Sequence, residues 1–91
     1  MYLYDNLRSS LFTDEGQLML LVIRDRVHRL LKLAGAVRMQ EALTGQSGDT
    51  WQMLACVDRL VELGELSELK YGDCAGQHRV FVAKDSREVT T

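Results

Sequence analysis

The segment between Asp49 and Lys84 constrains the fold most, because a helix, an abrupt stop and two short strands follow one another there. Asp49 suits the start of a helix, and Gln52 stands three residues on at the capping-box spacing. Apolar residues then recur at spacings of three and four and form one helix face; they are Met53, Cys56, Val57, Leu60 and Leu63. Because of this spacing, we expect Val57 and Leu60 to be buried.

The strand signals begin directly after this helix. The helix ends at Leu63-Gly64, and a strand is expected from Leu66. A glycine-containing loop at residues 72–77 then turns the chain into a second strand, Arg79 to Ala83. The sequence therefore predicts a helix that leads straight into a β-hairpin.

This order of elements resembles the recognition helix and wing of a winged-helix domain. The run VDRLVELGEL, residues 57–66, looks much like the end of such a helix. The resemblance covers residues 14–84 and matches no one family's motif. It implies an α+β fold with three main helices, a small antiparallel sheet and a β-hairpin wing.

The chain before residue 49 supplies the remaining elements. A long helix is expected from Asp14, as N-cap paired with Gln17, to Ala34, with Gly35 as a left-handed C-cap. Residues 36–39 suit a short strand and residues 40–44 a short second helix. Residues 1–13 then form an N-terminal arm with a short helix, residues 14–84 the domain, and residues 85–91 a polar tail.

The long helix is apolar on more than one stripe, so a second side must be covered. The N-terminal arm or a second copy of the chain are the nearest candidates. This predicts a homodimer built on the long helix and the arm, with Leu18, Met19 and Val22 as candidate partner-binding residues.

The DNA-binding function that the resemblance implies can be placed on particular side chains. In a DNA-reading winged helix, Arg59 would pair with guanine and Gln52 with adenine in the major groove. Lys70, Arg79 and Lys84 would meet phosphates around the wing. Asp58 and Glu62, however, share the helix face with Arg59.

The charge balance also bears on the choice of partner. The formal net charge is −2 and the pI is about 5.6, whereas nucleic-acid binders are more often basic. The local charge on one face matters more than the total. Trp51 stands beside the polar face of the helix and either packs near Leu43 or serves as an exposed anchor for a protein partner.

Metal and catalytic sites are not expected. Cys74 and His78 lie four residues apart, but a structural zinc site needs four ligands, and Cys56 and His28 stand at no recognisable spacing. No phosphate loop or nucleophile motif is present, so neither an enzyme nor a cofactor is predicted. The longest apolar run, Leu18 to Ile23, is too short for a membrane span, and the N-terminus lacks a signal-peptide pattern.

These observations lead to two expectations. The first is a cytoplasmic DNA-binding protein that regulates transcription as a homodimer and binds double-stranded DNA. The second is a winged-helix module for protein–protein interaction in a larger complex, without DNA binding. Fold analogy alone does not decide between them.

Overall fold

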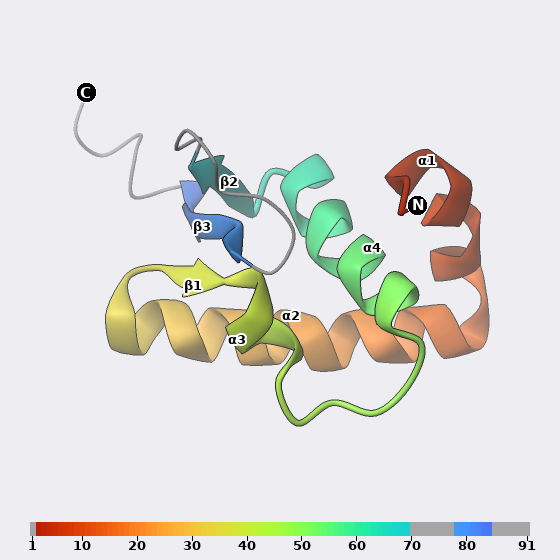
Figure 1. The fold of residues 1–91 in the computed structure, drawn as a ribbon, viewed down its shortest axis with the longest axis horizontal. Helices are drawn as coiled ribbons and strands as arrows, with labels where there is room; N and C mark the ends of the chain where they lie inside the picture. The colour runs from red at the N-terminus through yellow and green to blue at the C-terminus, as the bar shows by residue number, and fades with distance from the viewer. Residues whose placement is uncertain (1, 70–77, 85–91) are drawn as a thin grey trace.

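Helices and a small sheet make up the computed structural model, which describes residues 2–69 and 78–84 (Figure 1). The elements in chain order are α1 (Tyr4–Leu7), the 3-10 helix η1 (Arg8–Phe12), α2 (Asp14–Ala34), β1 (Val37–Arg38), α3 (Met39–Leu43), α4 (Thr50–Glu62), β2 (Leu66–Leu69) and β3 (Val80–Ala83). The fold is thus α+β as predicted, and the element order is compatible with a winged-helix-like fold. Among the described residues, no helix is long and apolar enough to cross a membrane.

The long helix α2 occupies the predicted range, but its first cap differs from the prediction. Thr13, not Asp14, is the N-cap, and its hydroxyl accepts a hydrogen bond from the Gly16 N–H at 3.0 Å. The Gln17 side chain donates instead to the Leu11 carbonyl, because the arm folds back over the start of α2. The other end is as predicted: Gly35 has a φ of 80° and donates to the Leu31 carbonyl.

The sheet is antiparallel and has the strand order β1-β3-β2. β3 lies in the middle, with Phe81 opposite Val37 of β1 on one side and opposite Glu68 of β2 on the other. The strand predicted at residues 36–39 is therefore present, although it contains only Val37 and Arg38. The predicted loop at residues 72–77 lies outside the described residues.

The core lies between α2, α4 and the sheet. Val57 and Leu60 of α4 are fully buried, as predicted, and Phe81 of β3 is the largest fully buried side chain among the described residues. The remaining buried apolar residues are Leu11, Leu20, Ile23, Val27, Val37, Met39, Ala42, Met53, Ala55, Cys56 and Leu66. One apolar stripe of α2 packs into this core, whereas the opposite side of the helix does not contact it.

The start of α4 shows which part of the capping prediction holds. Asp49 caps the helix and accepts from the backbone N–H groups of Trp51 and Gln52 at 2.8 and 3.3 Å. The Gln52 side chain does not complete a capping box. It donates to the Ser10 carbonyl of the arm at 3.3 Å.

The N-terminal arm packs against its own domain. In Figure 1, α1 and η1 lie beside α4 and above the first turns of α2. Leu11 of η1 is fully buried in the shared core. The backbone of η1 also approaches α2 so closely that a Cβ on Gly16 would stand 2.2 Å from the Ser10 carbonyl oxygen.

Candidate interaction surfaces

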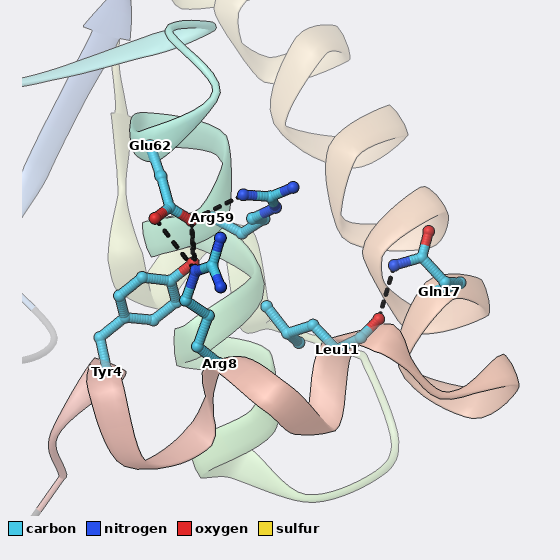
Figure 2. A network of polar contacts seen from close by, with 6 residues as sticks. All are labelled: Tyr4, Arg8, Leu11, Gln17, Arg59 and Glu62. Carbon is cyan, nitrogen blue, oxygen red and sulfur yellow. Dashed lines mark hydrogen bonds and ion pairs between the residues drawn. The ribbon is translucent and has the colours of Figure 1, made fainter.

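The polar face of α4 is covered by the arm. Glu62 is the centre of these contacts (Figure 2). Its carboxylate accepts a hydrogen bond from the Tyr4 hydroxyl at 2.6 Å and from Arg8 Nε at 3.0 Å. Arg59 of the same helix donates to it at 2.7 Å. Glu62 therefore binds two arm residues and neutralises the cation next to it.

The ionisation of this cluster follows from its contacts. Hydrogen bonds from Tyr4, Arg59 and Arg8 lower the pKa of Glu62 to about 2. Burial and the hydrogen bond to Glu62 raise the pKa of Tyr4 to about 12. At neutral pH the carboxylate is thus charged and the phenol is neutral, which is the pairing that holds the arm.

Phe12 adds an aromatic contact to the same cluster. The guanidinium carbon of Arg8 and that of Arg59 each lie 5.2 Å from the centre of the Phe12 ring, within the usual range of cation–π contacts. The Arg59 side chain is consequently only 18% exposed. The residue predicted to read guanine is held between Glu62 and the arm.

Arg79, predicted to contact phosphate, is also engaged within the chain. Its guanidinium donates to Glu68 at 2.9 and 3.0 Å and to Asp58 at 2.7 Å. The Arg79 side chain is 18% exposed, and each carboxylate side chain is 15% exposed. Hydrogen bonding to Glu68 outweighs burial, and together with Asp58 it raises the pKa of Arg79. The Tyr2 hydroxyl closes this cluster with a hydrogen bond to Asp58.

The other residues that were predicted to bind DNA do not combine with Arg59 and Arg79 into a basic surface. Gln52 is half-buried beneath the arm and bonded to Ser10. Lys84 is exposed at the end of β3. Lys70 lies outside the described residues. Among the described residues, the structure thus brings Gln52 and Arg59 onto one helix and covers both.

A different surface is open on α2. Leu18, Leu21 and Val22 are 66%, 57% and 52% exposed. Their spacing of three and four places them on one side of the helix, opposite the buried stripe. We call these three side chains the α2 patch. Leu18 and Val22 were predicted from the sequence to bind a partner, and the structure leaves both uncovered.

A shallow groove borders the α2 patch. It has a volume of about 190 Å³ and is lined by Leu18, Met19, Val22, Ile23, Gln46, Ser47 and Met53. Met19, the third predicted partner-binding residue on α2, is half-buried in its wall. The groove has room for an apolar side chain from outside the chain.

Charged side chains flank the α2 patch. Asp14 and Glu15 occupy the first turn of α2, and Lys32 the last. Arg29 and Asp25 form an exposed ion pair at 3.1 Å. Trp51, the other predicted anchor, is 46% exposed at the start of α4.

A second, larger groove lies between α2 and the end of α4. It measures about 410 Å³ and contains Arg24, His28 and Glu65. Glu65 accepts from Arg24 at 2.7 Å and contacts His28 at 2.9 Å. These hydrogen bonds outweigh the effect of burial and lower the pKa of Glu65. The acid is thus paired with Arg24 in this groove.

Within residues 2–69 and 78–84, no three potential ligands come together at a possible metal site. Cys74 lies outside these ranges. Burial raises the pKa of Cys56 to about 12, so its thiol is protonated at neutral pH.

The sequence predicted an arm that packs on the domain or on a second chain, but it did not place the arm residues on α4; these residues are Tyr2, Tyr4, Arg8 and Phe12. The sequence offered one signal for this contact: aromatic residues are concentrated in the first dozen positions, and one face of the helix at residues 50–63 carries two acids and an arginine that could bind them. Comparison with protein families, curated proteins and solved structures found no match to this chain.

Proposed function

We propose that this chain is a protein-interaction domain that binds through the α2 patch, and that it does not read duplex DNA. The observation that carries the proposal is the exposure of Leu18, Leu21 and Val22, each more than half accessible on one side of α2. Contiguous exposed apolar side chains with a polar border are typical of protein-binding sites. The acids and bases at the two ends of α2 supply such a border.

The covered face of α4 supports the second half of the proposal. A helix must bring unpaired side chains to base edges to read DNA. Here Arg59 is bound to Glu62 and Arg79 to Asp58 and Glu68. Releasing either arginine for a phosphate or a base would leave carboxylates facing the phosphates. The expectation of a DNA-binding regulator thus becomes the less favoured one.

A photo-crosslinking residue placed at position 21 tests the binding surface. In cells that produce the protein, we expect position 21 to form a discrete covalent adduct with a protein. Position 33 is a matched control, because Leu33 is an even more exposed leucine of α2, at 84%, away from the α2 patch. The proposal fails if position 21 forms no adduct, or if both positions give the same pattern.

A filter-binding series tests the exclusion of DNA. We expect no retention of random duplex even at about 50 mM salt, where electrostatic binding is strongly enhanced. Retention that falls with increasing salt and is weakened by Lys84→Ala would contradict the proposal. Lys84 is the informative residue because it is an exposed cation beside the sheet.

A further inference from the structure

We propose that the occupant of the α2 patch is the α2 patch of a second copy of this chain, packed antiparallel about a two-fold axis beside Leu21 and Val22. The inference rests on the function proposed above and names its partner. It follows from where the apolar and charged residues stand along the exposed side of α2.

The apolar residues lie near one point of the helix. Leu18 and Val22 are separated by about 6 Å along the helix axis, at a rise of about 1.5 Å per residue. An interface with two-fold symmetry brings the same patch of both copies together. With the axis beside Leu21 and Val22, Leu21 of one copy lies opposite Val22 of the other, so these two side chains cover each other, and Leu18 lies opposite Asp25.

The charges select the antiparallel orientation. The same axis places Asp14 of one copy opposite Arg29 of the other, and Glu15 about one residue further along. Lys32 follows at the end of the helix. A parallel pair would instead place acid against acid and base against base. The helix dipoles also favour an antiparallel pair, because opposite ends then meet.

The current partner of Arg29 does not prevent this contact. The side chains of Asp25 and Arg29 are each about 70% exposed. An ion pair that is this exposed contributes little to stability. The guanidinium has donors enough to retain Asp25 while it binds an acid of the second copy.

The expected dimer is small, because the arm already covers α4. One helix face provides less than about 1,200 Å² of total interface, the lower end of the range for specific complexes. The dimer is therefore expected to dissociate in the micromolar range and to exchange its subunits. This favours measurements over a wide range of concentration.

Sedimentation equilibrium of Leu21→Lys gives the first test. The two new lysines would stand beside the two-fold axis, so we expect dimerisation to weaken by at least roughly a hundredfold, since two like charges and lost apolar burial act together. Leu33→Lys is the matched control and is expected not to weaken dimerisation, because position 33 stands beside Lys32 at the basic end of α2. Both positions are exposed, and circular dichroism verifies that each variant folds.

Charge reversal gives the second test, and it distinguishes the two orientations. Asp14→Arg alone and Arg29→Glu alone should each weaken dimerisation, by roughly tenfold, because two symmetry-related pairs become repulsive. The double variant, with both changes in one chain, should recover it in an antiparallel dimer. A parallel dimer would not recover, because like charges would still meet like.

The outcomes separate this inference from the proposed function. A monomer at all concentrations, together with an adduct of another protein at position 21, would overturn the second copy as occupant and leave the α2 patch as a binding site. A monomer without any adduct at position 21 would overturn both. A dimer that is insensitive to Leu21→Lys, or one that the double charge variant does not restore, would overturn the arrangement.

Discussion

Arg79 shows how the surroundings of a single residue decide its role. Its sequence position beside a predicted wing suggested a phosphate contact. In the structure it lies between Asp58 and Glu68, with its guanidinium carbon 5.2 Å from the centre of the Phe81 ring. This cation therefore connects α4, β2 and β3, and its contribution is to stability.

We predict that Arg79→Ala lowers the free energy of unfolding by roughly 3 kcal/mol, the lower end of the range for breaking a buried ion pair. The cause is the loss of the cation between two carboxylates that are each 15% exposed. Urea denaturation measures the change. Lys84→Ala removes an exposed cation nearby and is expected to change stability by less than about 0.5 kcal/mol. Equal stability of the two variants would contradict this role for Arg79.

Gly16 gives a second prediction at this scale. Replacing a glycine inside a helix by alanine usually stabilises the protein, by about 1 kcal/mol. At Gly16 the added Cβ would stand 2.2 Å from the Ser10 carbonyl oxygen and 2.6 Å from the Leu11 Cα. These are backbone atoms that cannot rotate away, so Gly16→Ala is expected to destabilise the protein. A thermal melt decides the sign, and an increase in melting temperature would show that η1 does not pack on α2 as described.

The arm and α4 act together at the scale of the elements. Tyr2, Tyr4 and Arg8 each bond to a residue of α4. The buried Leu11 anchors the end of the arm in the core. The first part of the arm can therefore be released by changes to its polar contacts while the rest stays packed.

We predict that Glu62→Ala exposes Arg8 to proteases. The substitution removes the acceptor of both Tyr4 and Arg8, so that the arm opens locally more often. Trypsin should then cleave after Arg8 faster than in the wild type, while the thermal melt of the domain changes little. Glu15→Ala, an exposed acid on α2, is the control. An unchanged cleavage rate would show that Glu62 does not hold the arm.

Acidification should release the arm in the same way. The pKa of Glu62 is lowered to about 2 in the folded protein, against about 4.3 for an unperturbed glutamate. The stabilisation is thus fully present above the unfolded pKa and is lost as the pH falls through the folded one, between about 4 and 2. Carboxyl NMR should find the Glu62 midpoint near the lower value. A midpoint above 4 would mean that the cluster does not form in solution.

The elements were easier to predict than their contacts. The bounds of α2 and α4 followed from helical periodicity and from Gly35 and Gly64, which are local signals. Tyr4 and Glu62, in contrast, are 58 positions apart, and their hydrogen bond depends on how the whole arm folds back. The exposure of Leu18 and Val22 was indicated by the excess of apolar residues on α2, whereas the burial of Arg59 and Arg79 had no local signal.

At the scale of the whole molecule, the two sides of the helices have different roles. The arm covers the polar face of α4, and the sheet and α4 cover the inner stripe of α2 (Figure 1). Of the large apolar side chains that stay exposed among the described residues, Leu18, Leu21 and Val22 lie together in the first half of α2. A net charge of −2 is small enough that two copies repel each other weakly.

We therefore predict that the melting temperature rises with protein concentration. Binding that requires the folded state stabilises it by mass action, and a micromolar dimer should show this between about 5 and 500 μM. Leu21→Lys should remove the dependence, whereas Leu33→Lys should retain it. Differential scanning fluorimetry at a series of concentrations measures the effect. A melting temperature that is independent of concentration in the wild type would contradict the dimer.

The arm that covers α4 has a consequence for any outside molecule that would bind there. Because the arm belongs to the same chain, it acts at an effective concentration of about 1 mM or more. An arm that bound as a free peptide with a dissociation constant of only 0.1 mM would still be closed roughly nine-tenths of the time. An outside ligand would then lose about a factor of ten in apparent affinity. The first residues of this chain thus serve as a built-in competitor, and even weak contacts suffice to keep α4 occupied.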